Sequence, residues 1–274
     1  MSEPAFSDPI AAQYYHQGET ELETTQSADA VLRKADLCGQ QDSRADITQS
    51  AFYYLAAAHF LERRDLSKSA YGYHNAGQQL VRLHQFTQAG RAYSGAGKVA
   101  EQAAQIAPPG PDQQSLQHLA VRSYSKANHC FAEAGELDWS ETEYLHERNA
   151  RITWASMQGK HPLALLAWKA SSNFGTSIPR WSAWIAATIA LFSLLYEFFF
   201  RIHWLEPMAN TNPSAWVPFW SGFYYSINVT SSLALVEYQP VHPLCQAVVM
   251  LNVIAGYLFL GIGIGIIGQM VKRR

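Results

Sequence analysis

The chain contains few cysteines. Cys38, Cys130 and Cys245 are scattered over 274 residues without any paired spacing. A sparse, odd set in a long chain is typical of a protein in a reducing compartment, and it gives no basis for a disulfide framework. We therefore expect the three cysteines to be small buried apolar residues.

Charge is also unevenly distributed. Of the 20 Lys and Arg residues 15 precede residue 179, and so do 19 of the 22 Asp and Glu residues. The last third is thus nearly uncharged, which predicts a polar domain joined to an apolar one. The formal net charge of −2 gives no indication of nucleic-acid binding.

The first 25 residues contain neither a basic segment nor an apolar core of the kind that a signal peptide requires. We expect residues 1–25 to be a flexible or weakly helical lead-in. Histidines are isolated, the segment Gly95–Lys98 lacks the spacing of a phosphate loop, and no Ser/His/Asp arrangement is recognisable. The sequence therefore predicts no enzyme, no cofactor and no metal site.

Two apolar runs dominate the last third, residues 181–202 and residues 243–271. The second run has about 29 uncharged residues, which as a helix reach roughly 40 Å and exceed a hydrocarbon core of about 30 Å. Between the runs lies a shorter aromatic segment with the sequence FWSGFYYSINVTSS, followed by LALVEYQPVHP. Irregular backbone at membrane depth is tolerated only where it lines a cavity or is buried in protein. The pattern predicts two membrane spans with a re-entrant element between them.

Basic residues predict the orientation of these spans. Lys160, Lys169 and Arg180 precede the first span and Lys272 to Arg274 follow the second, whereas no Lys or Arg lies between Arg201 and Lys272. By the positive-inside rule both termini are expected in the cytoplasm, with residues 203–242 on the other side. Within the spans, Glu197 and Arg201 are spaced to form a structural ion pair, and Asn252 is expected to form an interhelical hydrogen bond.

Residues 226–240, SINVTSSLALVEYQP, resemble the pore loop of tetrameric two-transmembrane potassium channels. The likeness extends over residues 181–274 and implies a homotetramer in lipid whose partners are permeant inorganic ions. In that family the pore loop contains a Gly-Tyr-Gly filter, which here is Ala234-Leu235-Val236. Glycine permits backbone angles that are costly for other residues, above all for valine, so strict potassium selectivity is not expected. The predicted filter and pore residues are Thr230, Ser231, Ser232, Leu233, Ala234, Leu235, Val236 and Glu237.

Glu237 would form a ring of carboxylates at the outer mouth, or face water without a role in conduction. The hydroxyls of Thr230, Ser231 and Ser232 would either meet entering ions or cap the carbonyls of the short helix. In the second span, small residues allow either close helix packing or an apolar gate. By the same resemblance, the hinge and gate residues are Gly256, Gly261, Ile264 and Gly265.

Residues 26–158 show an alanine-rich helical pattern with breaks at Gly39, Asp65, His84, Pro108–Pro111 and Gly135. The expected helices are 26–40, 46–63, 66–84, 86–106, 113–135 and 138–158. The segment LHQFTQAGRAYSGAG, residues 83–97, resembles the helical repeats of tetratricopeptide and SNAP-type adaptor proteins, although a plain helical bundle remains an alternative. In the repeat interpretation Tyr71, Tyr93 and Tyr124 line a face that binds a protein or peptide partner; otherwise they pack between helices.

The sequence thus predicts an all-α protein with four segments: the lead-in, a cytoplasmic helical-repeat domain (26–158), a juxtamembrane linker (159–180) and a two-span pore-loop domain (181–274). The predicted function is a cation-conducting tetrameric channel, integral to the plasma or inner membrane, whose helical domain gates the pore or recruits a partner. Two alternatives are an adaptor anchored by a non-conducting pore module and an ordinary potassium channel.

Overall fold

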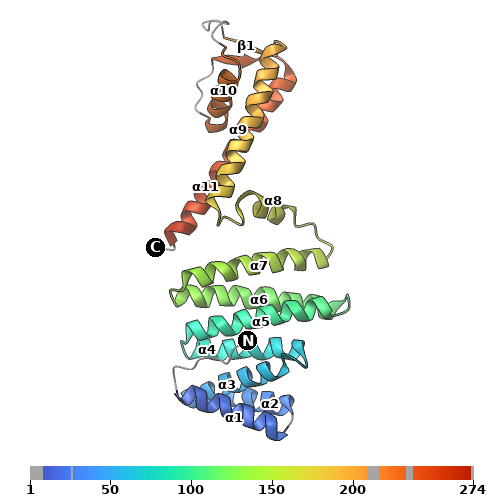
Figure 1. The fold of residues 1–274 in the computed structure, drawn as a ribbon, viewed down its shortest axis with the longest axis vertical. Helices are drawn as coiled ribbons and strands as arrows, with labels where there is room; N and C mark the ends of the chain where they lie inside the picture. The colour runs from blue at the N-terminus through green and yellow to red at the C-terminus, as the bar shows by residue number, and fades with distance from the viewer. Residues whose placement is uncertain (1–8, 26, 209–215, 233–236, 273–274) are drawn as a thin grey trace. The chain divides into compact units, whose positions relative to one another are not determined.

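The computed structural model describes residues 9–25, 27–208, 216–232 and 237–272, with side chains up to residue 268 (Figure 1). The described residues are almost entirely helical, which confirms the all-α class. Contacts between Cα atoms divide the chain into two compact units, residues 1–163 and residues 164–274. We call them the helical unit and the membrane unit.

In the helical unit each helix from α2 to α6 packs mainly on helices adjacent to it along the chain, whereas α1 packs mainly on α3. Helices α3 to α7 begin and end within two residues of the expected bounds, because Gly, Asp and Pro interrupt the apolar pattern there. The elements are α1 (Pro9–Thr25), α2 (Ala28–Gly39), α3 (Arg44–Leu61), α4 (Leu66–Arg82), α5 (Phe86–Ile106), α6 (Pro111–Glu133) and α7 (Leu137–Met157).

Helix α1 occupies most of the expected lead-in and corresponds to the helical one of the two alternatives for it. Residues 9–25 form a regular helix that packs against α3. The side chains of Ala11, Tyr15 and Leu22 are buried in the same apolar cluster as Phe52 and Tyr53. The sequence 1–25 is polar overall, but its few apolar residues lie on one face of a helix, and that face is sufficient to dock it.

The two hairpins α4–α5 and α6–α7 share one turn geometry. The turn residues His84 and Gly135 both have left-handed backbone angles, with φ of 57° and 77°. In each turn the following amide donates to a carbonyl five residues earlier, from Gln85 to Leu80 (3.0 Å) and from Glu136 to Phe131 (2.8 Å). Such a left-handed residue ends a helix and reverses the chain in a few residues. These two hairpins therefore reverse the chain in the same way.

Glycines let neighbouring helices of this unit approach closely. A methyl group added at Gly97 would lie 2.5 Å from the ring of Tyr124, and one added at Gly77 would lie 2.9 Å from the ring of Tyr93. Both aromatic rings are buried. The recurring Ala-Gly and aromatic residues are thus the two sides of one contact, in which an aromatic side chain covers the bare backbone of a neighbouring helix.

The membrane unit contains two long apolar helices, α9 (Ile178–Arg201) and α11 (Pro243–Lys272), preceded by the short helix α8 (Leu163–Ser172). By length and composition α9 and the segment Pro243–Gly268 of α11 can each cross a membrane. Only 17% of the apolar window of α9 and 11% of that of α11 is buried. A core helix of a water-soluble protein would be mostly covered, so these surfaces require lipid or further protein.

Between the long helices lie a short helix and a small hairpin. Helix α10 (Trp220–Ser231) contacts both α9 and α11. Strands β1 (Leu205–Pro207) and β2 (Tyr238–Pro240) pair antiparallel, with Leu205 opposite Pro240. Figure 1 shows α10 alongside the end of α9 from which β1 continues. The 12 residues of α10 span about 18 Å, too short to cross a hydrocarbon core of about 30 Å.

Candidate functional site

The candidate site is the junction at which α10 lies between α9 and α11, here called the three-helix junction. Two glycines allow the backbones to meet there. A methyl group added at Gly222 of α10 would lie 2.7 Å from the carbonyl oxygen of Ser193 in α9. One added at Gly256 of α11 would lie 2.0 Å from the carbonyl oxygen of Thr230 at the end of α10. Both ends of the short helix are therefore held by backbone contact, which only small residues permit.

A buried hydrogen-bond network supports this junction. The side chain of Asn252 in α11 is 0% exposed. Its amide oxygen accepts a hydrogen bond from the Thr230 hydroxyl (2.8 Å), and its amide nitrogen donates to the Tyr196 hydroxyl of α9 (3.1 Å). The Ser226 hydroxyl of α10 donates to the carbonyl of Ile189 in α9 (3.0 Å). As expected for Asn252, one amide links all three helices.

At the C-terminal end of α9, Glu197 binds the segment that leads into α10. One carboxylate oxygen accepts from Arg201 (3.0 Å), in the ion pair expected from the spacing. The other oxygen accepts from the Trp216 indole (2.9 Å) and from the Phe219 backbone amide (3.2 Å). Phe219 has φ of 70°, so its backbone is in the left-handed region that costs energy for a non-glycine residue. The carboxylate stabilises this strained entry to α10.

Aromatic rings pack around the β1–β2 hairpin. The rings of Phe200 and Trp216 stack at 4.1 Å, and the edge of Tyr238 meets the Trp216 ring at 4.9 Å. Trp204 and His242 stack at 3.7 Å beside the hairpin. Offset and edge-to-face pairs are favourable beyond their buried area. They tie the end of α9 to the start of α11 and thus hold both ends of the intervening segment.

The C-terminal end of α10 faces a pocket of about 310 Å³ within the membrane unit. The Ser231 hydroxyl donates to the carbonyl of Ile227, one turn earlier (2.7 Å). The one proton of the Thr230 hydroxyl is shared between the Ser226 carbonyl (2.8 Å) and the amide oxygen of Asn252 (2.8 Å). A hydroxyl that donates still has lone pairs with which to accept. Ser232 follows with φ of 55° and an exposed side chain. Hydroxyl lone pairs and the negative end of the helix dipole thus lie together at this pocket.

Four of the predicted filter residues, Leu233, Ala234, Leu235 and Val236, lie outside the described residues. Glu237 follows them with an exposed side chain, and its backbone oxygen accepts from the Met208 amide (2.9 Å). The structure therefore places Thr230, Ser231 and Ser232 at one side of this segment and Glu237 at the other.

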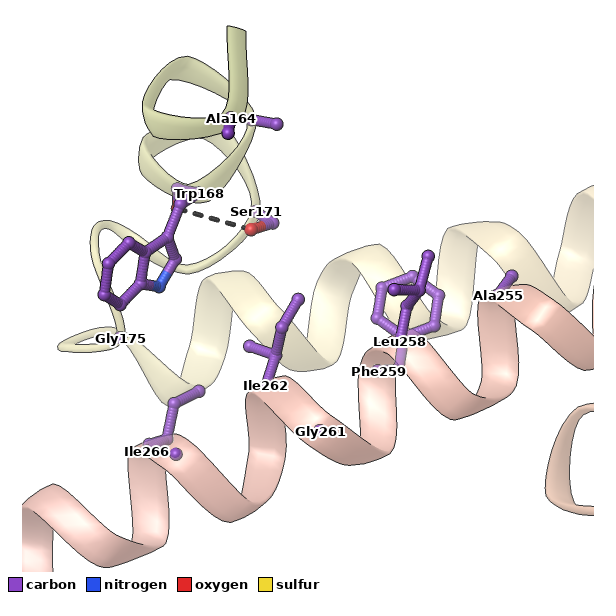
Figure 2. A pocket seen from close by; sticks show the side chains of 12 residues that line it. Ala164, Trp168, Ser171, Gly175, Ala255, Leu258, Phe259, Gly261, Ile262 and Ile266 are labelled. Carbon is purple, nitrogen blue, oxygen red and sulfur yellow. Dashed lines mark hydrogen bonds between the residues drawn. The ribbon is translucent and has the colours of Figure 1, made fainter. Parts of the chain in front are cut away.

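The predicted hinge and gate residues occupy different surroundings. Helix α11 continues without interruption through Gly256, which is explained by its contact with Thr230. Gly261 and Gly265 line an apolar groove of about 630 Å³ between α8 and α11, together with Trp168 (Figure 2). A methyl group added at either glycine would touch nothing within 4 Å, and Ile264 is 64% exposed. Close helix packing is therefore not observed at Gly261 and Gly265 within one chain, and the alternative of an apolar gate stays a prediction.

The three tyrosines predicted to bind a partner differ in exposure. Tyr71 is 48% exposed, whereas Tyr93 and Tyr124 are buried. Tyr124 donates to Glu101 (2.9 Å) and stacks on His146. A partner at the surface reaches only Tyr71; the other two fill spaces between helices, because Gly77 and Gly97 leave room for their rings.

Glu143 is a buried acid that sequence reasoning missed. Its side chain is 1% exposed, and one oxygen accepts from the Ser94 hydroxyl of α5 (2.7 Å). Burial raises the pKa of Glu143 above the ordinary 4.5, although the Ser94 hydrogen bond, His146 of α7 and Lys98 of α5 act in the opposite direction. No motif indicates this residue, since a single Glu in a polar helix is usually exposed.

A raised carboxyl pKa makes the helical unit less stable as pH rises. The neutral form of Glu143 favours folding below the ordinary pKa, and this contribution is lost as pH rises through the higher folded-state value. We predict that Glu143→Gln stabilises the unit at pH 7 by on the order of 1 kcal/mol and flattens its pH dependence. Thermal unfolding between pH 4 and 8 measures this, with the exposed Glu133→Gln as control. An unchanged pH slope in Glu143→Gln would contradict the prediction.

Within the described ranges no three His, Cys, Asp or Glu side chains gather closely enough to hold a metal ion. The residues that sequence reasoning missed at the junction are Ser193, Tyr196 and Gly222. A polar side chain or a glycine inside an apolar span is the signal that indicates them. Comparisons with protein-family models, with curated protein sequences and with solved structures give no match for this chain.

Proposed function

We propose that this chain is the subunit of a homotetrameric, cation-conducting membrane channel. In this proposal α9 and α11 cross the bilayer, both termini lie in the cytoplasm, and α10 is a re-entrant pore helix. The helical unit, with tetratricopeptide-like or SNAP-like hairpins, gates the pore or binds a cytoplasmic partner. The main support is α10 itself: a helix too short to span a bilayer, held by backbone contacts at Gly222 and Gly256 between two helices that are long enough.

The large uncovered apolar surface supports assembly. In α11 the exposed side chains include Leu251, Leu258 and Ile264. Polar backbone cannot be left open in lipid, so a re-entrant pore loop, as proposed, needs protein or a water-filled path around it. A closed ring of subunits supplies that path, and the likeness of residues 226–240 to a tetrameric family favours four copies.

The ion selectivity in this proposal follows from the charged and polar groups near the proposed ion path. Exposed Glu237 at one end and the carbonyl end of α10 at the other favour cations over anions. The absence of glycine from residues 233–236 opposes a potassium-type filter that removes the ion's water shell. The proposed path is therefore wider and passes partly hydrated cations, with potassium and sodium fluxes within about a factor of 3.

Flux from liposomes tests the proposal. The purified full chain should release potassium and sodium, and Glu237→Arg should lower both fluxes more than about tenfold because it replaces each carboxylate of the ring with a cation. Glu206→Arg is the matched control, since Glu206 is also exposed and lies on the paired strand β1; its flux should stay within about a factor of 2 of wild type.

Other outcomes distinguish the alternatives. A total lack of flux would support a membrane-anchored adaptor, in which the apolar residues 233–236 close the path. Strong preference for potassium over sodium would support an ordinary potassium channel. Equal losses in Glu237→Arg and Glu206→Arg would show that Glu237 has no special position at the path.

A further inference from the structure

The helical unit contains a pocket of about 450 Å³ formed by α4, α5 and α6. Gln78 of α4 and Ser125 of α6 are exposed at its rim, and Tyr93 of α5 and Lys126 of α6 lie further inside. A volume of this order suits a small molecule. The pocket lies entirely within the helical unit.

Lys126 is half-buried in this pocket and is held by two neutral groups. Its ammonium nitrogen lies 5.1 Å from the centre of the Tyr93 ring and 3.4 Å from Nε2 of His74. His74 is 4% exposed, and its Nδ1 lies 2.9 Å from the Ser123 hydroxyl. With Lys126 charged, Nε2 of His74 accepts from the ammonium and Nδ1–H donates to Ser123. This hydrogen-bond chain leaves the other ammonium protons for the pocket.

The positive charge at this position lacks a counter-ion. In the described part of the chain no carboxylate forms an ion pair with Lys126, and the charged group that acts most strongly on its ammonium is another cation, Arg122 of α6. Burial, followed by the repulsion from Arg122, lowers the pKa of Lys126. Burial also lowers the pKa of His74 to about 4, with Lys126 and Arg122 acting in the same direction. A desolvated cation beside a second cation is costly unless an anion joins it.

We propose that this pocket binds a small oxyanion, the phosphate or carboxylate group of a small molecule, with Lys126 as the charged ligand. The amide of Gln78 and the hydroxyl of Ser125 supply neutral donors at the rim, and Tyr93 offers an apolar wall to the rest of the molecule. A charge-assisted hydrogen bond to an oxyanion is about twice as strong as a neutral one. The site does not depend on the proposed channel, because binding is measured without any ion flux.

Calorimetric titration of the full chain in detergent tests this site, with inorganic phosphate and succinate as separate probes at ionic strength kept constant with sodium chloride. One probe at least should bind saturably and raise the unfolding temperature. Lys126→Met should weaken that binding more than about tenfold, and Lys126→Arg should retain it. Lys98→Met is the matched control, because Lys98 is an exposed lysine on α5, and it should bind like wild type.

The absence of saturable binding of both probes to the wild-type chain would overturn the proposal. So would equal affinity in Lys126→Met and wild type, which would show that the anion binds elsewhere. A preference for phosphate or for succinate identifies which oxyanion the pocket favours. Unfolding of Lys126→Met in the absence of ligand serves as the folding check: removal of an unpaired buried cation should leave its unfolding temperature unchanged or raise it.

Discussion

Gly256→Ala is expected to destabilise the membrane unit by about 2–4 kcal/mol, since overpacking against rigid groups costs this much or more. The added methyl group would lie 2.0 Å from the carbonyl oxygen and 2.9 Å from the carbonyl carbon of Thr230. Both atoms belong to the backbone of α10, so no side chain can rotate away. The helices must separate, which also weakens the hydrogen bond between Thr230 and Asn252. Unfolding in mixed micelles of increasing SDS content, followed by circular dichroism, measures the loss.

Gly265→Ala provides the control within the same helix. A methyl group there meets nothing within 4 Å in one chain, so the free energy of unfolding of the subunit should change by less than about 0.5 kcal/mol. If Gly256→Ala and Gly265→Ala were equally stable, the close contact of α10 with α11 would be wrong. In flux measurements Gly256→Ala should lose conduction together with stability, because the proposed pore helix depends on this contact.

Asn252→Leu is expected to lower the free energy of unfolding of the membrane unit by about 2 kcal/mol. Interhelical hydrogen bonds in membrane proteins contribute about 0.6 kcal/mol on average and at most about 1.7 kcal/mol each, and this substitution removes more than one. The substitution removes the amide that donates to the Tyr196 hydroxyl and accepts from Thr230, at a buried position. Thr230 keeps the Ser226 carbonyl as an acceptor. Leucine is similar in size but can neither donate nor accept. The same SDS unfolding measurement applies, and flux should fall because the end of α10 loses its anchor on α11.

Tyr196→Phe removes one hydrogen bond of this network and leaves the others in place. It removes only the hydroxyl that accepts from the Asn252 amide, so we expect a loss of about 0.6 kcal/mol. A loss in Asn252→Leu no greater than that in Tyr196→Phe would mean that Asn252 does not join the three helices. Agreement with the expected order would support the three-helix junction as the rigid part of the membrane unit.

Much of the helical unit could be predicted from the sequence because the residues that begin and end its helices act locally. Helices α3 to α7 begin and end near Gly, Pro and Asp residues, whose effects on the backbone act within one turn. At α1 the sequence left a flexible and a weakly helical segment open, since this helix is stabilised by burial of Tyr15 and Leu22 against α3, a contact between distant parts of the chain. For Tyr93 and Tyr124 the sequence left a binding face and packing between helices open, because an aromatic residue beside alanines fits both equally well.

In the membrane unit the sequence alone determined that two apolar helices flank a short element, because hydrophobicity and length are properties of the chain itself. The sequence also showed which positions within those apolar helices are polar, including Asn252. Only the tertiary structure decided what these residues do. It joined Asn252 to Thr230 and Tyr196, and it placed Gly256 against the Thr230 carbonyl. Hydrogen bonds and steric contacts between helices depend on distances of a few ångströms across the fold, and no spacing along the chain encodes those distances.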